Sequence, residues 1–242
     1  MNIVRMENMH SIPPDAPQIF EAIVNCRRSC RRFLPDPVPV SLLRALLSLA
    51  GRAPSGSNIQ PWRAHVITGP PLHELTRAMI TALRSEPEQH KADFEYYPRT
   101  WREPFLLRRR ATGWGLYGLL GIAKGDLEAS TAQHARNYLF FDAPAAVILT
   151  LDDDMEIGSW LDLGMFAQTF ILAATANGLA TCPQVSIARF HGLISKHLGL
   201  PASEKVILSI AVGRRDDSAP ENQLATVRAE VDEYVRFHGC AP

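Results

Sequence analysis

Apolar residues recur at intervals of three and four along several stretches of the chain, which is the spacing of one face of an α-helix. The run IFEAIV at residues 19–24 shows this spacing clearly. We predict helices over residues 16–28, from Ser41 through the leucines that follow it, and over 71–85, 113–140 and 158–177. Two of these helices have capping signals at their N-termini. Asp15 with Gln18 resembles a capping box, and Ser41 is placed to cap the helix that follows it.

Three shorter segments have the pattern of strands. Residues 62–68 alternate between apolar and polar side chains, whereas 145–151 and 206–213 are continuous apolar runs typical of buried strands. These strands are few and far apart, and the predicted helices surround them. The pattern therefore favours an α+β fold around a small mixed sheet over the regular alternation of a doubly wound fold.

We expect residues 1–242 to form one domain with two appendages. The hydrophobic content of 46% is enough for a substantial core. Residues 86–112 mix charged and aromatic side chains, and we interpret them as a lid or an arm that wraps a neighbouring subunit. Residues 218–242 form a polar tail that we expect to cross the surface or embrace a partner.

Charge and cysteine usage narrow the possible partners. Lys plus Arg and Asp plus Glu number 25 each, so the formal net charge is zero, which argues against nucleic-acid and membrane-surface partners. Residues 158–177 include Asp162 and Gln168, which favours a buried helix over a membrane span. The first ten residues lack the features of a signal peptide. We expect a cytoplasmic protein with reduced thiols at Cys26, Cys30, Cys182 and Cys240.

Some familiar motifs lack the context that would give them meaning. GWGLYG at residues 113–118 matches G-x-G-x-x-G but follows RRRAT instead of a strand, so we interpret it as small residues in a closely packed helix. The aspartates at 152–154 have the pattern of a solvated turn more than of a metal site. No G-x-S-x-G elbow is present.

Two other stretches are richer in binding groups than their position requires. RRSCRRF at residues 27–33 holds four arginines, and in an extended segment Arg27, Ser29 and Arg31 would share one side. Such a side could bind a phosphate, although a solvated basic helix end explains the charges equally well. RAPSGSNIQPW at residues 52–62 offers hydroxyls, amides and a glycine that allows close approach, where a capped turn would need only some of them.

Taken together, these stretches resemble the FMN-dependent nitroreductase family, and most closely its nitrobenzoate-type branch. RRSCRRF, a helix, APSGSNIQPW and a strand follow one another in the family's order. GLATCPQ, HLGLP, the strand ending at Gly213 and the tail DSAPENQLATVRAEVDEYVRFHG continue it, so that the resemblance covers about residues 17–239. It implies a nitroreductase-like fold, in which helices wrap a small mixed sheet, and an intertwined homodimer with FMN at two equivalent interface sites.

The resemblance also implies which residues bind FMN. The RRSCR stretch would serve the phosphate, ribityl chain and ring edge, with Arg28 contributing its main chain, and the loop at 54–60 would reach the same FMN from the other subunit. The main chain of residues 183–185 would pass the reactive edge of the ring, and a tail arginine would grip the phosphate. The implied residues are Arg27, Arg28, Ser29, Arg31, Pro54, Ser55, Gly56, Ser57, Asn58, Gln60, Pro183, Gln184, Val185 and Arg228.

The implied activity is a ping-pong transfer of electrons from NADH or NADPH to a nitroaromatic, quinone or similar flat acceptor. The resemblance implies no acid–base side chain and no metal. Arg214 and Arg215 stand where many members have an aromatic residue or a proline. Two kinds of alternative stay open. One is a flavoenzyme of the same fold with another reaction: a dehalogenase, a flavin-fragmenting enzyme or a dehydrogenase. The other is a non-enzymatic FMN-binding protein.

Overall fold

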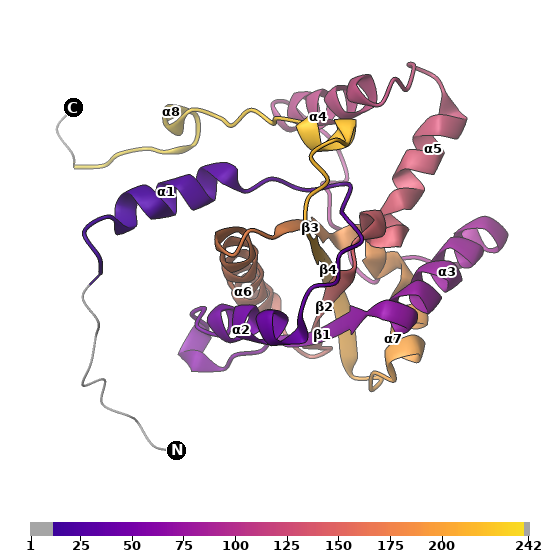
Figure 1. Ribbon diagram of the computed structural model, residues 1–242, viewed down its shortest axis with the longest axis horizontal. Helices are drawn as coiled ribbons and strands as arrows, with labels where there is room; N and C mark the ends of the chain where they lie inside the picture. The colour runs from indigo at the N-terminus through magenta and orange to yellow at the C-terminus, as the bar shows by residue number, and fades with distance from the viewer. Residues whose placement is uncertain (1–11, 240–242) are drawn as a thin grey trace.

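A four-stranded sheet forms the centre of the computed structural model, which describes residues 12–239; the first ten residues and Cys240 lie outside this range. Its strands are β1 (Arg63–Thr68), β2 (Ala145–Asp152), β3 (Ala180–Gln184) and β4 (Glu204–Gly213). They pair antiparallel in the order β1-β2-β4-β3 (Figure 1). The parallel pairing that makes the predicted sheet mixed is limited to a bridge between Ser29 and Thr181.

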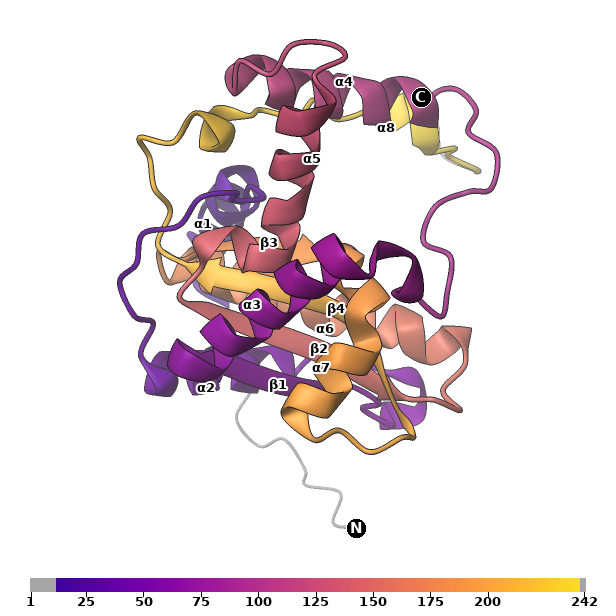
Figure 2. The ribbon, with the colours of Figure 1, turned by 90° about the vertical axis from the view of Figure 1, so that its right-hand side faces the viewer.

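Helices cover both faces of the sheet, which explains why β2 is apolar from Ala145 to Leu149 and buried as far as Leu151. Its side chains point alternately to two cores, so that Val147 and Leu149 lie in one core and Ile148 lies in the other. Helices α2 (Val40–Ala50) and α6 (Ile157–Ala176) pack on the first face, and α3 (Gly69–Ser85) and α7 (His191–Leu198) on the second (Figure 2). The strand and helices predicted for β2, α2, α3 and α6 are confirmed within a few residues, whereas α7 was not predicted.

Both predicted helix caps are wrong. Helix α1 (Ala16–Cys26) does follow Asp15, but the Asp15 side chain makes no capping hydrogen bond, because its φ of −89° and ψ of 0° are not the extended conformation that capping requires. Helix α2 begins at Val40, after Pro39, so Ser41 lies inside the first turn. In both helices a proline lies at the start, where no side-chain cap forms.

The helix predicted over residues 113–140 is three elements: α4 (Phe105–Leu119), α5 (Leu127–Ala135) and a 3-10 segment, η3 (Arg136–Asp142). Gly121 and Gly125 separate the first two with φ values of 68° and 92°, a conformation that glycine adopts without steric cost. Asp126 then caps α5 by accepting a hydrogen bond from the Ala129 amide at 3.0 Å. Five further short turns complete the chain: η1 (Gly56–Asn58), η2 (Pro87–Gln89), η4 (Val185–Phe190), η5 (Pro220–Gln223) and α8 (Val231–Tyr234).

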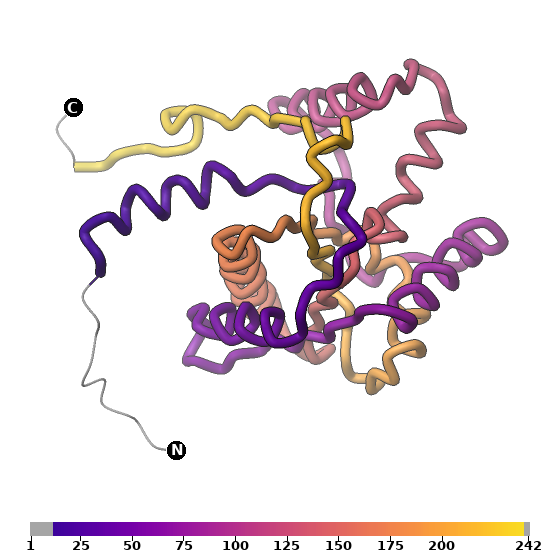
Figure 3. Tube along the Cα trace, in the orientation of Figure 1, coloured from indigo at the N-terminus to yellow at the C-terminus, as the bar shows by residue number. Residues whose placement is uncertain are grey.

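Helix α6 is half buried, as a core helix is. Of the helices within residues 12–239, it alone is long and apolar enough to cross a membrane, and 44% of its most apolar window is buried against the rest of the protein. Its other side leaves Ile157 79% exposed and Leu161 67% exposed, and α1 buries no side chain at all. α1 and the tail that carries α8 extend away from the sheet on the side of α6 (Figure 3). Much apolar surface is therefore uncovered in a single chain.

Candidate functional site

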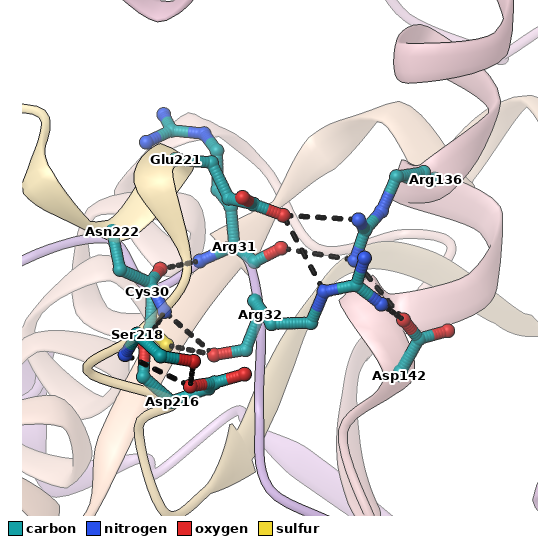
Figure 4. Close-up of polar contacts among 9 residues, drawn as sticks. All are labelled: Cys30, Arg31, Arg32, Arg136, Asp142, Asp216, Ser218, Glu221 and Asn222. Carbon is teal, nitrogen blue, oxygen red and sulfur yellow. Dashed lines mark hydrogen bonds and ion pairs between the residues drawn. The ribbon is translucent and has the colours of Figure 1, made fainter. Parts of the chain in front are cut away.

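The arginine-rich segment lies beside β3. After α1, Arg27 turns the chain into an extended conformation with φ −59° and ψ 123°. Ser29 pairs with Thr181 of β3 in a parallel bridge. Side chains of an extended segment alternate in direction, and Figure 4 shows Arg31 and Arg32 pointing to different sides. The shared side predicted for the odd-numbered residues therefore lies alongside β3, with Ser29 next to its beginning.

The positive charges on this side lack protein partners. Among residues 12–239, none of Arg27, Arg28, Arg31 and Arg228 forms an ion pair. Burial lowers the pKa of Arg27, and the nearby charges of Arg228 and Arg28 lower it further. Arg228 hydrogen-bonds only to the two residues before it. A phosphate dianion would offset this repulsion, since guanidinium groups match its oxygens in charge and geometry.

The segment of residues 183–185 lies at the end of β3, where Pro183 is exposed and Gln184 is buried. The Gln184 amide nitrogen donates to the main-chain oxygen of Asn137 at 2.7 Å, while its Oε1 has no partner within the described residues. The side chain of Gln184 thus braces η3. A cofactor contact from residues 183–185 would come from the main chain, as the resemblance implies.

The polar loop at residues 54–60 is held by its own side chains. Ser55 Oγ accepts a hydrogen bond from the Gln60 amide at 2.9 Å, and Gln60 Nε2 donates to the Asn58 main-chain oxygen at 3.2 Å. Ser57, Asn58 and Gln60 adopt φ values of 49°, 58° and 50°, a left-handed region that non-glycine residues seldom occupy. The loop is thus strained, and the side chains of Ser57 and Asn58 are exposed and point to no protein partner within residues 12–239.

Asp162 anchors this loop, a role that the sequence did not reveal. The Gly56 amide donates to Asp162 Oδ2 at 3.2 Å, and the carboxylate is buried on the first turns of α6. In the sequence, Asp162 is a lone polar residue in an apolar run, which argues only against a membrane span. Its partner is 106 residues away, so no local pattern connects the two.

The predicted residues form two separate groups within one chain. One group lies along β3 and consists of Arg27, Ser29, Arg31, Arg228 and residues 183–185. The loop at 54–60 lies instead against α6, and no hydrogen bond or ion pair within residues 12–239 joins it to the first group. Figure 1 shows the connection after α2 near the lower end of α6, away from β3. One chain therefore does not assemble all the predicted residues.

A cluster of ion pairs beside the arginine segment was also missed by sequence reasoning (Figure 4). Arg136 binds Asp142 at 3.0 Å and Glu221 at 3.0 Å, and Arg32 binds the same two carboxylates at 2.6 Å and 3.5 Å. Asp142 ends a left-handed run that begins at Phe140, with φ values of 49°, 55° and 64°. Arg136 and Asp142 are only 6 residues apart, but Arg136 and Glu221 are 85 apart and Arg32 and Asp142 are 110 apart, so no local pattern reveals the whole cluster.

The two arginines after β4 have different surroundings. Arg214 is exposed, whereas Arg215 donates to the main-chain oxygen of Asn222 at 2.9 Å and pairs with Asp217 at 3.0 Å. Arg215 therefore shapes the beginning of the tail.

The GWGLYG motif lies inside α4, where a Cβ at Gly115 would be 3.0 Å from Leu224 Cδ1. The interpretation of this motif as small residues in a packed helix is confirmed at Gly115.

The excursion at residues 86–112 is irregular up to Pro104, and its last residues begin α4. Its aromatic side chains cluster with an arginine, since the ring centroids of Tyr97 and Trp101 are 5.2 Å apart and Arg109 lies 4.7 Å above the Trp101 ring. The Arg189 guanidinium donates to the Pro87 main-chain oxygen at 2.7 Å. That bond ties the start of the excursion to η4, which directly follows β3.

Comparisons with known proteins agree with this arrangement. The model of the nitroreductase family matches residues 24–214. A nitrobenzene nitroreductase of Ectopseudomonas oleovorans is 35% identical over 224 residues, which cover 93% of this chain and 98% of the relative. A 4-nitrobenzoate reductase of Nocardioides sp. (strain LMS-CY) is 37% identical over 225 residues, covering 91% and 90%.

Solved structures share the fold closely. The FMN-dependent nitroreductase NfnB from Mycobacterium smegmatis, in complex with NADPH, has a TM-score of 0.88 to this chain. The two sequences are 34% identical, and the similarity covers 93% of this chain and 100% of that one. The similarity therefore extends through the excursion and into the tail.

Proposed function

Because the chain belongs to the nitroreductase family, we propose that it is an FMN-dependent oxidoreductase that passes electrons from NADPH or NADH to nitroaromatic compounds. Two of its relatives are a nitrobenzene nitroreductase and a 4-nitrobenzoate reductase, which supports this class of acceptor. Quinones and other flat acceptors fit the same class, since they too can stack on a flavin ring.

The observation that carries this proposal is the group of arginines without counter-charges beside β3. Arg27, Arg31 and Arg228 would hold the phosphate of FMN, with the Ser29 hydroxyl and the Arg28 main chain nearby. Each charge-assisted hydrogen bond of this kind contributes about 1.5–3 kcal/mol. No carboxylate within residues 12–239 competes for these guanidinium groups.

Bound FMN supplies the electron-carrying ring, and the chain positions it. The main chain at the exposed Pro183 would approach the reactive edge of the ring, while the buried Gln184 side chain keeps this strand end in place. Ser57 and Asn58 offer a free hydroxyl and a free amide to the polar edges of the ring. No side chain is required as a general acid or base.

The complete site requires two chains, so we place FMN at the interface of an intertwined homodimer. The loop at 54–60 and the arginine segment are separate in one chain. In the dimer, the loop of one chain would meet the arginine segment of the other. The exposed apolar sides of α1 and α6 would be buried there. The tail of residues 218–242 would embrace the partner, and the excursion at 86–112 would cover the acceptor.

We also expect the enzyme to work in the cytoplasm. The three cysteines within the described residues, Cys26, Cys30 and Cys182, are free thiols, as a reducing compartment allows.

Steady-state kinetics with 4-nitrobenzoate test the proposed function. Oxidation of NADPH or NADH that depends on the acceptor and consumes the nitro group is the expected result. An FMN-loaded enzyme that oxidises neither nicotinamide with nitroaromatics or quinones, but removes halogen from a halogenated aromatic substrate, would replace the proposal with the dehalogenase reading of this fold.

A further inference from the structure

Two side chains from distant parts of the sequence hold the main chain of Arg31 from opposite sides (Figure 4). Asn222 Oδ1 accepts a hydrogen bond from the Arg31 amide at 2.7 Å. Arg136 Nη2 donates to the Arg31 carbonyl oxygen at 3.1 Å. Both polar groups of the Arg31 peptide are thus fixed by side chains, whereas Ser29, two residues earlier, is held by pairing with β3.

The donors and the acceptor of the Asn222 side chain are all used in hydrogen bonds to the main chain, of which the one to Arg31 is accepted by Oδ1. Its Nδ2 donates to the main-chain oxygens of Arg32 at 2.7 Å and Asp216 at 2.8 Å. The residue is only 6% exposed. An amide supplies both an acceptor and two donors, so a shorter or purely apolar side chain at this position would leave buried main-chain groups unpaired.

Arg136 is itself fixed by acidic partners. Glu221, which is only 3% exposed, and Asp142 each lie 3.0 Å from its guanidinium. Arg32 pairs with the same carboxylates, so the segment is attached through its side chains as well as its main chain. Breaking a buried ion pair on one side is costly, and the arrangement therefore resists displacement of Arg31.

We propose that Asn222 and Arg136 are positioning residues that fix the Arg31 main chain and thereby aim the arginine segment at the flavin. This role rests on the proposed function. Asn222 lies on η5, at the beginning of the tail that carries Arg228. The same contact therefore sets where the tail departs toward the phosphate, and it couples the two sources of positive charge in the site.

A double-mutant cycle on FMN affinity tests this role. We expect Asn222→Ala to raise the dissociation constant of FMN about tenfold, because it removes the hydrogen bond to the Arg31 amide together with the two to the Arg32 and Asp216 oxygens that orient it. In an Arg31→Ala background the same substitution should cost clearly less than tenfold, because the part of its effect that passes through the Arg31 side chain is already lost while the main-chain contact remains. The control is Gln223→Ala, since Gln223 is exposed and bonds only to Asp217, and its expected effect is negligible.

Hydrogen–deuterium exchange gives a readout that does not depend on flavin. Asn222→Ala should speed exchange in peptides covering residues 27–33 and leave β2 and β4 unchanged, whereas Gln223→Ala should leave all of them unchanged. If Asn222→Ala does not fold, Asn222→Ser replaces it and should show the same pattern to a smaller degree.

Equal penalties in both backgrounds, or unchanged exchange at 27–33, would overturn the positioning role while leaving the proposed function intact. A wild-type protein that binds no FMN would instead overturn the proposed function, and the role of Asn222 and Arg136 toward flavin would fall with it.

Discussion

At the scale of single residues, the site is built from charge and main-chain geometry. Burial lowers the pKa of Arg27, and the like charges of Arg228 and Arg28 lower it further. None of Arg27, Arg31 and Arg228 has an acidic partner within residues 12–239. Nearby Arg32 and Arg136 do have acidic partners, and they brace the segment. The arginines therefore divide into those free to bind an anion and those that support them.

Arg228→Ala is expected to weaken FMN binding while leaving the fold intact. Loss of a charge-assisted bond of about 1.5–3 kcal/mol corresponds to roughly 10- to 150-fold in the dissociation constant. Fluorescence titration of FMN measures it, with Arg236→Ala as control, because Arg236 is an exposed tail arginine that bonds only to nearby main-chain oxygens. Equal affinities of Arg228→Ala and the wild type would remove Arg228 from the site.

The Cys182 thiol predicts a pH dependence of stability. Burial raises its pKa from the ordinary 9.0 to about 12, so the folded state favours the protonated thiol. Its contribution is complete below pH 9 and is lost as the pH rises from 9 towards 12. Between pH 8 and pH 10 the wild type should lose about 1.4 kcal/mol more stability than Cys182→Ala.

Urea denaturation of both proteins at the two pH values measures this difference. Parallel losses in the wild type and in Cys182→Ala would show that Cys182 titrates normally and is not buried as described.

At the scale of elements, hydrophobic periodicity predicts those that bury an apolar stripe. Helices α3 and α6 and strands β1, β2 and β4 were predicted within a few residues. Strand β3 was missed because ATCPQ is short and contains Pro183, and its strand character comes from pairing with β4. Asp162, Arg136 and Asn222 were missed for a related reason, since their contacts join positions more than 80 residues apart.

Gly213→Ala is expected to destabilise the end of β4. A Cβ at Gly213 would lie 2.6 Å from Pro144 Cδ and 3.2 Å from Phe33 Cδ1, in a buried position with little room to adjust. Such overpacking costs about 1–3 kcal/mol. At roughly 2–4 °C per kcal/mol for a chain of this size, thermal unfolding should detect the change.

The matched control is Gly113→Ala in α4, where no atom lies within 4 Å of the added Cβ. Alanine is favoured over glycine within a helix, so its melting temperature should be unchanged or slightly higher. Equal melting temperatures for Gly213→Ala and the wild type would show that β4 tolerates the methyl group.

At the scale of the whole molecule, a single chain leaves much apolar surface uncovered. The loop at 54–60 and the arginine segment lie apart (Figure 1), and α1, α6 and the tail carry exposed apolar side chains. The sequence resemblance predicted this dimer, and the exposed surfaces are the reason we propose it. A neutral net charge does nothing to oppose association.

Leu161→Glu is expected to break the dimer and to release FMN with it. Leu161 is two-thirds exposed on the outer side of α6, and a charge buried at an interface without a partner is unfavourable. Light scattering should give twice the chain mass of 26.8 kDa for the wild type and a monomer for the variant.

His73→Glu on α3, across the sheet from α6, is the control for the added charge and should stay dimeric and yellow. A monomeric wild type that retains FMN, or a Leu161→Glu variant that is still a dimer, would contradict the interface proposed for α6.

The visible absorption spectrum of the purified protein, recorded without oxygen, tests the central claim most directly. We predict a yellow protein whose flavin absorption bleaches on addition of NADPH or NADH and returns on addition of 4-nitrobenzoate. A yellow protein that neither nicotinamide bleaches would contradict the oxidoreductase and favour a flavin store. A colourless protein that does not take up added FMN would contradict the cofactor site itself.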